Sequence, residues 1–320
     1  MISKPFSREI LPLGFGCAWL SGGRRAETSL RLVEAAYDSG IRYFDIARMY
    51  MLGGAEGVLG QFLPKHRAEM IVTSKAGIMP PPGDRVRGLL HRADKIANRV
   101  FGKPIPDREA YRFNVFDTRS LRKSVDKSLR ELRTDHLDAL LLHEVDVPYL
   151  ADGSVMALLE KLRDTGKIGS FGFASTREQT DRLVAQYGAR VPIIQTASTV
   201  LEDGLAPLAN RGKFITITHS VLARALMDIV GRLGEDDAFR KRWTTLTGLD
   251  PASRERVAEL LLAEALDANR DGIVLFSTTV PARIAAAARV ARDRPYSPDQ
   301  IAGLRDLAAC FDNPTAKRPS

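Results

Sequence analysis

Cysteine, aromatic residues and long apolar runs are all scarce in this 320-residue sequence. The two cysteines, Cys17 and Cys310, are too few for a disulfide framework and are not spaced as a metal site. No stretch approaches the roughly 20 apolar residues that span a bilayer, and residues 1–10 lack the apolar segment of a signal peptide. We therefore expect a cytoplasmic protein with no metal and no membrane partner.

The sequence also has no long run of charged residues of the same sign, although its formal net charge is +8. Lys and Arg are spread along the chain and alternate with Asp and Glu, as in RKSVDKSLREL. With aromatic residues at only 7%, this distribution favours solvated helix faces and a site for a small anionic ligand. It argues against a nucleic-acid partner.

The sequence does contain eight short apolar runs that alternate with amphipathic segments. Each run is bounded by Gly or polar residues and is rich in β-branched or aromatic residues, which is typical of a buried strand. They are LPLGFGCAWL (11–20), RYFDIA (42–47), EMIVTSKAG (69–77), LDALLLHE (137–144), GSFGFAS (169–175), VPIIQTAS (191–198), KFITITHS (213–220) and GIVLFST (272–278). Residues 28–40, 118–133 and 155–166 show helical patterns between them.

Eight strand and helix repeats predict an α/β protein, a (β/α)8 TIM barrel forming a single domain over residues 1–320. An open doubly wound sheet is the alternative, but the first strand lacks the G-x-G-x-x-G spacing that such a sheet usually carries. Residues 79–117 and 221–251 interrupt the alternation, and we expect long loops there after strands three and seven. Such loops contribute to the active site or merely cover the barrel edge.

Several predicted helices have recognisable capping residues at their ends. We expect Ser154 and Ser297 to cap the helices that follow them. Gly40 and Gly166 stand where a helix ends in a left-handed residue.

Polar residues follow three consecutive predicted strands: Asp45, Lys75 and His143, with Tyr50 shortly after Asp45. The carboxyl ends of barrel strands build one face, so these groups are expected to meet. An ammonium held beside the phenol would lower the tyrosine pKa from about 10, and the tyrosine could then exchange a proton with a substrate oxygen. Singly, each residue has a structural interpretation as a cap, a solvated lysine or a core histidine.

Four segments resemble the aldo-keto reductase family, in order along most of the chain. GIRYFDIARMYMLGGAEGVLGQFL (40–63) is similar to the family signature around its catalytic tyrosine, and IVTSKAG to the segment with its lysine. SLRELRTDHLDALLLHE resembles the block that ends in the family's histidine, and GKIGSFGFAST the next strand. Within the family, these segments most resemble those of the aldose 1-dehydrogenase-like branch.

The resemblance implies a barrel that binds a nicotinamide dinucleotide, with Asp45, Tyr50, Lys75 and His143 as its catalytic tetrad. FSTTVPARI resembles the segment that binds the adenosine 2′-phosphate, with Arg283 as the phosphate ligand. A guanidinium fork suits that group, so NADP is favoured over NAD. The full set of cofactor residues implied by the resemblance is Ser175, Thr176, Gln195, His219, Ser220, Leu222, Arg224, Ser277, Thr278 and Arg283.

Some positions depart from the family pattern. His219 stands where an aromatic residue commonly stacks on the nicotinamide, and Ser277 where a lysine often binds phosphate. Met51 replaces the glycine that usually follows the tyrosine, and we expect it to line the substrate site with Trp19. A buried core tryptophan is the alternative for Trp19. The insertion also carries Arg85, Arg87, His91, Arg92 and Arg99, which either attract an acidic substrate or form one basic helix face.

The sequence thus predicts an oxidoreductase that transfers a hydride between NADP(H) and an aldehyde, a ketone or the corresponding alcohol. The alternatives are an NAD(P)-dependent aldose 1-dehydrogenase and a cofactor-binding regulatory subunit with little turnover. A barrel hydrolase or lyase explains neither Lys75 nor FSTTVPARI. The expected partner is a small carbonyl compound or sugar, and the expected state is a monomer or small homo-oligomer.

Overall fold

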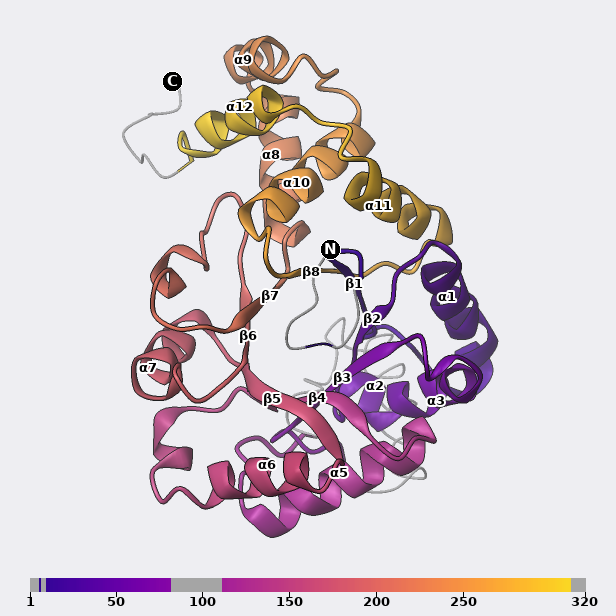
Figure 1. Cartoon of the computed structure of the whole chain (residues 1–320). Coiled ribbons are helices and arrows are strands. Elements are labelled where there is room, and N and C mark those ends of the chain that lie inside the picture. Colours follow the sequence, from indigo (N-terminus) through magenta and orange to yellow (C-terminus); the bar gives the residue numbers. More distant parts are fainter. Residues whose placement is uncertain (1–5, 7–9, 82–110, 312–320) are drawn as a thin grey trace, which may run out of the picture. The chain divides into compact units, whose positions relative to one another are not determined.

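The computed structural model describes residues 6, 10–81 and 111–311 of the chain. Eight parallel strands form a closed barrel in the order β1 to β8 (Figure 1), which confirms the predicted fold class. The strands are β1 Leu13–Gly16, β2 Tyr43–Asp45, β3 Ile71–Ala76, β4 Leu137–His143, β5 Ile168–Ala174, β6 Ile193–Ala197, β7 Ile215–His219 and β8 Ile273–Phe276. Seven of the eight predicted apolar runs contain a whole observed strand, and β5 begins one residue before its run.

Helices follow the strands along the chain, as the alternation predicts. The α-helices are α1 Ala26–Asp38, α2 Tyr50–Gly53, α3 Ala55–His66, α5 Thr118–Leu132, α6 Ser154–Asp164, α7 Arg177–Tyr187, α8 Ala223–Glu235, α9 Asp237–Thr247, α10 Arg254–Ala268, α11 Pro281–Asp293 and α12 Pro298–Ala308. Short 3-10 turns are η1 Gly23–Arg25, η3 Val147–Leu150 and η4 Ala206–Leu208. No helix of the described residues is long and apolar enough to cross a membrane.

Two compact units make up the chain. Unit 1 contains Met1–Phe15, Ala35–Arg42 and Thr176–Ser320, and unit 2 contains Gly16–Glu34 and Tyr43–Ser175. Each unit is described by itself below.

In unit 2, strands β2 to β5 run parallel, so their carboxyl-terminal ends lie at the same edge of the sheet. Asp45 of β2 pairs with Thr73 of β3, and Lys75 of β3 pairs with Leu141 of β4. Helices α5 and α6 lie side by side along these strands (Figure 1). Helix α5 begins at its cap Asp117, whose carboxylate accepts from the Ser120 backbone N–H at 2.9 Å. Because β2, β3 and β4 are in parallel register, the polar residues at their carboxyl-terminal ends lie at one edge of the sheet.

The amphipathic pattern of α5 explains why it covers the sheet. Leu121, Val125, Leu129 and Leu132 are buried at helical spacing, while the basic residues between them face outward. Burying each such side chain contributes about 1.5–3 kcal/mol relative to leaving it exposed. Helix α3, which follows β2, packs against α5, which follows β3.

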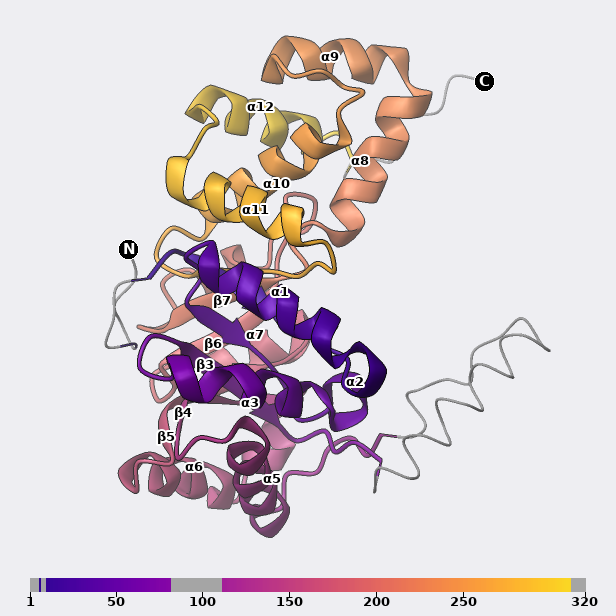
Figure 2. The same cartoon turned by 90° about the vertical axis from the view of Figure 1, so that its right-hand side faces the viewer.

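Unit 1 contains strands β6, β7 and β8 in parallel register, with β1 paired to β8. Helices α8 to α12 gather together in this unit (Figure 2). Residues 221–251, where we expected a long loop, are largely helical, because they contain α8 and α9. Helix α9 buries Phe239 and Trp243, an apolar spacing that the sequence analysis overlooked. Of the other expected loop, 79–117, residues 82–110 lie outside the described part of the chain.

The helix ends agree with the sequence at three positions and differ at one. Gly40 and Gly166 have φ of 90° and 74°, and Ser297 forms a capping box with Gln300 at the start of α12. Ser154 is the first residue of α6 rather than its cap, which is Gly153. The Ser154 backbone N–H and hydroxyl both donate to Asp152 at 2.9 Å, so a turn before the helix takes over the capping role.

Candidate active site

Three neighbouring strands deliver three of the four predicted catalytic residues. Asp45 is the last residue of β2, Lys75 the last but one of β3, and His143 the last of β4. Tyr50 begins α2, immediately beyond β2. All four belong to unit 2, and the parallel register brings their side chains to one edge of the sheet.

Lys75 joins Asp45 and Tyr50. Its Nζ donates to the Asp45 carboxylate and, at 3.0 Å, to the Tyr50 hydroxyl. A third bond runs from Nζ to the Ile46 carbonyl oxygen at 3.3 Å. The Asp45 and Lys75 side chains are buried, with 3% and 2% of their surfaces exposed. The predicted contact between an acid, an ammonium and a phenol is therefore present in the geometry.

His143 lies against the same phenol. Its ring meets the Tyr50 ring edge to face, with centroids 6.2 Å apart and planes at 86°. Both side chains are half-buried. An imidazole in this place can hydrogen-bond an oxygen that also reaches the Tyr50 hydroxyl.

The pKa of Tyr50 differs from the sequence expectation. Burial raises the pKa of the phenol above its usual value of about 10, and the neighbouring Lys75 ammonium only partly offsets this. The expected lowering was wrong because it counted the positive charge and not the loss of water. Burial by itself lowers the pKa of Lys75, but Asp45 and Tyr50 outweigh it, and the net pKa is raised. At neutral pH, Lys75 is therefore charged and Tyr50 protonated.

The turn that carries Tyr50 is strained. Met51 and Leu52 adopt left-handed conformations with φ of 48° and 57°, followed by Gly53 at 85°. Each non-glycine residue there costs about 1–2 kcal/mol. The Leu52 backbone N–H donates to the Tyr111 hydroxyl at 3.1 Å, and a Cβ on Gly53 would lie 2.9 Å from Pro80. Met51 thus adopts a conformation that the glycine of the family pattern would adopt without strain.

A buried ion pair lies beside this turn, and the sequence analysis missed it. The Arg48 and Glu56 side chains are 1% and 0% exposed, and Arg48 Nη1 lies 2.8 Å from Glu56 Oε2. The Ser74 hydroxyl donates to the other Glu56 oxygen at 2.7 Å. The spacing of Arg48 and Glu56 around Tyr50 was visible in the sequence. Charged residues are rarely buried, so their pairing in the interior could not be inferred from it.

The predicted cofactor residues are divided between the units. Ser175 belongs to unit 2, where its hydroxyl donates to the Val145 carbonyl oxygen at 2.8 Å. The other nine belong to unit 1. Thr176 caps α7, and its hydroxyl accepts from the Gln179 backbone N–H. Gln195 is buried on β6.

The remaining cofactor candidates follow β7 and β8. His219 ends β7, and its Nδ1 lies 2.9 Å from the hydroxyl of Ser220, which has φ of 61°. Leu222 caps α8, and the exposed Arg224 lies 3.5 Å from Asp228. After β8, the Thr278 hydroxyl accepts from the Val280 backbone N–H at 3.2 Å. Ser277 and Arg283 are exposed nearby in the sequence, and Arg283 makes no ion pair with any described residue.

The two candidate substrate residues are accessible. Trp19, just after β1, is 61% exposed, so the alternative of a buried core tryptophan was wrong. Met51 is half-buried in the strained turn. The five basic residues Arg85, Arg87, His91, Arg92 and Arg99 lie outside the described residues.

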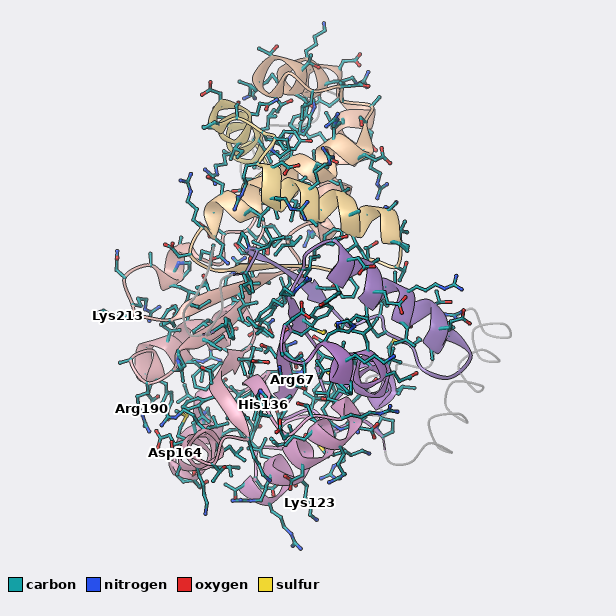
Figure 3. All side chains as sticks on the ribbon, turned by 45° about the vertical axis from the view of Figure 1, so that its right-hand side comes forward. Arg67, Lys123, His136, Asp164, Arg190 and Lys213 are labelled. Carbon is teal, nitrogen blue, oxygen red and sulfur yellow. The ribbon has the colours of Figure 1, made fainter. Side chains whose placement is uncertain are left out.

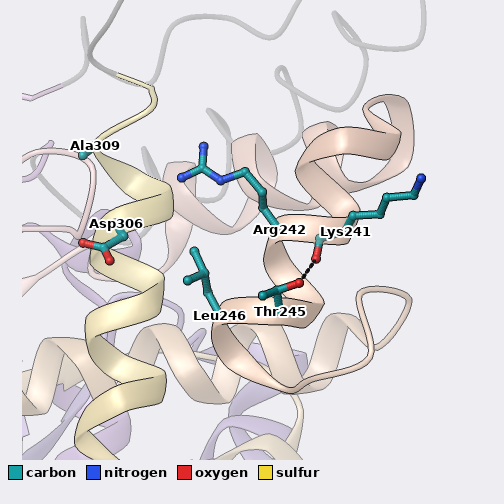
Figure 4. Close-up of a pocket in the computed structure, with 6 residues that line it drawn as sticks. All are labelled: Lys241, Arg242, Thr245, Leu246, Asp306 and Ala309. Atoms are coloured by element: carbon teal, nitrogen blue, oxygen red, sulfur yellow. Dashed lines mark hydrogen bonds between the residues drawn. The ribbon is translucent and has the colours of Figure 1, made fainter.

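A separate surface pocket of about 570 Å³ lies in unit 1, between α9 and α12 (Figure 4). It is lined by Lys241, Arg242, Thr245, Leu246, Asp306 and Ala309. None of these is a predicted site residue. The Arg242 guanidinium donates to the Cys310 thiol at 3.2 Å.

Comparison with known proteins decides the family. The family model described as "Aldo/keto reductase family" matches residues 12–309. The chain belongs to this family. The match covers all eight strands, and it contains Asp45, Tyr50, Lys75 and His143.

Curated members of the family resemble parts of the chain. A D-threo-aldose 1-dehydrogenase from a Pseudomonas species is 32% identical over 203 residues, or 61% of this chain and 59% of that protein. An NADH-specific methylglyoxal reductase from Escherichia coli is 28% identical over 222 residues, or 67% of this chain and 62% of that protein. The chain therefore spans about three fifths of the length of these relatives.

Solved structures of the family share the fold. An aldo-keto reductase from Bacillus halodurans in its holo form has a TM-score of 0.70 at 20% identity, covering 94% of this chain and 93% of that one. An aldo-keto reductase from Klebsiella pneumoniae in complex with NADPH has a TM-score of 0.65 at 22% identity, covering 97% and 94%. At these identities the similarity concerns the barrel alone.

Proposed function

We propose that the chain is an NADP(H)-dependent oxidoreductase that transfers a hydride between the cofactor and the carbonyl carbon of an aldehyde or ketone. The observation that carries this proposal is Lys75, whose buried ammonium donates to both the Asp45 carboxylate and the Tyr50 hydroxyl. That arrangement suits a phenol acting as general acid or base. Membership of the aldo/keto reductase family supports the same chemistry.

Each of the four residues has a separate role in this proposal. Tyr50 donates its hydroxyl proton to the carbonyl oxygen as the alcohol forms. Lys75 stabilises the resulting phenolate from 3.0 Å, and Asp45 keeps the Lys75 ammonium charged in its buried position. His143, edge to face with the Tyr50 ring, hydrogen-bonds the substrate oxygen and aims it at the phenol.

Arg283, in the segment FSTTVPARI after β8, suits a dinucleotide that carries a 2′-phosphate. Arg283 is exposed, follows β8 and makes no ion pair with any described residue, so its guanidinium is available for an anion. The cofactor, when bound, supplies or accepts the hydride. Its nicotinamide amide is assigned to Ser175 and Gln195, and its ring face to His219. NADP is accordingly favoured over NAD.

The raised pKa of Tyr50 favours reduction at neutral pH. A phenol whose pKa lies above 10 keeps its proton through the physiological range. It is then a proton donor without prior ionisation, which carbonyl reduction needs. Alcohol or sugar oxidation needs the phenolate as a base, and its rate should rise with pH until Tyr50 ionises.

Small carbonyl compounds and aldoses are the proposed substrate class. The relatives named a methylglyoxal reductase and a D-threo-aldose 1-dehydrogenase support this choice. Met51 adds apolar bulk next to the phenol, and the exposed Trp19 ring offers a flat surface in the same unit. An aldose 1-dehydrogenase remains the second candidate because of the resemblance to the Pseudomonas enzyme.

The test is a cofactor and substrate panel with the purified chain. NADPH and NADH are each mixed with methylglyoxal, aromatic aldehydes and ketones, and NADP and NAD with aldoses, while cofactor absorbance is followed. We expect NADPH consumption with at least one carbonyl compound. Tight NADPH binding without turnover in any mixture would instead identify the regulatory subunit. Neither binding nor turnover would contradict the proposal.

The Arg283→Ala variant tests the choice between the two cofactors. A charge-assisted hydrogen bond contributes about 1.5–3 kcal/mol, so the Kd for NADPH should rise by about tenfold or more, whereas the Kd for NADH should not change. Fluorescence titration of each cofactor measures both. The exposed Arg224, already beside Asp228, provides the matched control in Arg224→Ala, which should affect the two cofactors equally. An equal loss for both cofactors in Arg283→Ala would contradict the assignment.

A further inference from the structure

The buried Arg48–Glu56 ion pair brackets Tyr50 in the sequence. Arg48 precedes Tyr50 by two residues, and Glu56 follows in the first turn of α3. Replacing a buried ion pair with apolar residues of similar volume is often neutral or stabilising. Stability alone is therefore a weak explanation for two fully buried charges at this place.

The pair contacts the strand that carries Lys75 on one side and the turn that carries Tyr50 on the other. On the β3 side, the Arg48 backbone N–H donates to the Lys75 carbonyl oxygen at 3.3 Å. Ser74, the neighbour of Lys75, donates its hydroxyl to Glu56 at 2.7 Å. On the tyrosine side, Arg48 Nη1 donates to the Gly53 carbonyl oxygen at 3.4 Å. One network thus ties the turn that carries Tyr50 to the strand that carries Lys75.

The turn between these anchors needs to be held. Met51 and Leu52 occupy the left-handed region, which such residues adopt only when the surrounding structure determines it. Arg48 closes the turn at Gly53, and Tyr111 holds the backbone of Leu52. Arg48 Nε has no hydrogen-bond partner among the described residues, so the guanidinium is held through Nη1 by Glu56 and Gly53.

We propose that the Arg48–Glu56–Ser74 network positions the Tyr50 hydroxyl against Lys75 Nζ. Its three members are positioning residues, because each acts through the 50–53 turn or through β3 and not on a reacting atom. The inference rests on the proposed function, in which Tyr50 exchanges a proton with the substrate. It also explains how a methionine is accommodated after the tyrosine, where the family pattern has glycine.

The test replaces Arg48 and Glu56 together, so that neither charge is left in the interior without its partner. In Arg48→Met/Glu56→Gln both charges disappear, and the glutamine amide can still accept from Ser74. The matched control is Arg67→Met/Asp138→Asn. Arg67 and Asp138 form an ion pair of 2.8 Å in the same unit, and Arg67 also donates to the Met70 and His136 carbonyl oxygens. Figure 3 labels Arg67 and His136. The control therefore loses an ion pair and backbone contacts elsewhere on the sheet.

We expect kcat to fall by about 10- to 100-fold in Arg48→Met/Glu56→Gln, as misplacement of a reacting group does, with KM for NADPH and the carbonyl substrate unchanged. The Tyr50 pKa should also rise further, because a hydroxyl displaced from Lys75 loses the largest influence that lowers its pKa. Tyrosinate absorbance measures it, as the difference between each variant and the same variant with Tyr50→Phe. The control should lower the melting temperature while kcat and the Tyr50 pKa stay as in the wild type.

An unchanged kcat and Tyr50 pKa in Arg48→Met/Glu56→Gln, or an equal loss in the control, would overturn the inference. If the double variant does not fold, Ser74→Ala replaces it. We expect this variant to lose kcat several-fold at unchanged KM, and wild-type kcat would overturn the inference. If the wild type shows no turnover, the proposed function fails. The Tyr50 titration still decides the positioning role, because it needs no substrate.

Discussion

Tyr50→Phe should lower kcat for carbonyl reduction by about two to four orders of magnitude, the usual contribution of a general acid. The substitution removes only the hydroxyl that receives the Lys75 hydrogen bond and keeps the ring that meets His143. The Kd for NADPH should therefore stay unchanged, and the loss should appear in turnover. Steady-state kinetics and a fluorescence titration measure the two quantities.

The matched control is Tyr187→Phe. Tyr187 belongs to unit 1, where its hydroxyl accepts from the Gln186 amide at 3.3 Å. The same atom is deleted, and kcat should not change. If Tyr50→Phe kept turnover within a factor of about three, too little for a general acid, Tyr50 would not be the acid or base.

Lys75→Met should abolish measurable turnover and also destabilise the fold. Without the ammonium, the buried Asp45 carboxylate loses its ion-pair partner Lys75, and breaking a buried pair typically costs about 3–5 kcal/mol. The pKa of Tyr50 should rise further, because Lys75 is the largest influence that lowers it. Chemical denaturation gives the free energy of unfolding, and tyrosinate absorbance gives the pKa.

The double variant Lys75→Met/Asp45→Asn separates these two effects. Removing the buried Asp45 charge should recover much of the lost free energy of unfolding, whereas turnover should remain absent. Recovery of both would show that Lys75 acts only as the structural partner of Asp45. Recovery of neither would show that the amide cannot replace the carboxylate in the interior.

The sequence predicted the barrel well because a buried parallel strand has a plain signature. Runs such as LDALLLHE are apolar on both faces, and the observed β4 lies inside that run. The α9 segment was harder. Phe239 and Trp243 make its buried face, but its many polar residues, as in FRKRWTT, resemble a loop when no packing partner is known.

The residues that make up the site could be predicted from the sequence, but the direction in which the pKa of Tyr50 is shifted could not. Asp45, Lys75 and His143 follow successive strands, and the register of parallel strands brings such residues together. The direction of the Tyr50 pKa shift was not predictable, because it depends on how much water surrounds the hydroxyl. The Arg48–Glu56 ion pair could not be predicted either, because the sequence does not show that these two charged side chains are buried.

Isotope transfer from labelled cofactor tests the central claim most directly. The chain is incubated with NADPH that carries deuterium at both C4 positions and with a carbonyl compound that it reduces in the panel. Mass spectrometry and NMR then locate the label in the alcohol. We predict one deuterium at the carbinol carbon with wild-type protein and about 100-fold slower labelling with Tyr50→Phe. An alcohol without deuterium, or equal labelling rates in the two proteins, would contradict hydride transfer at a site served by Tyr50.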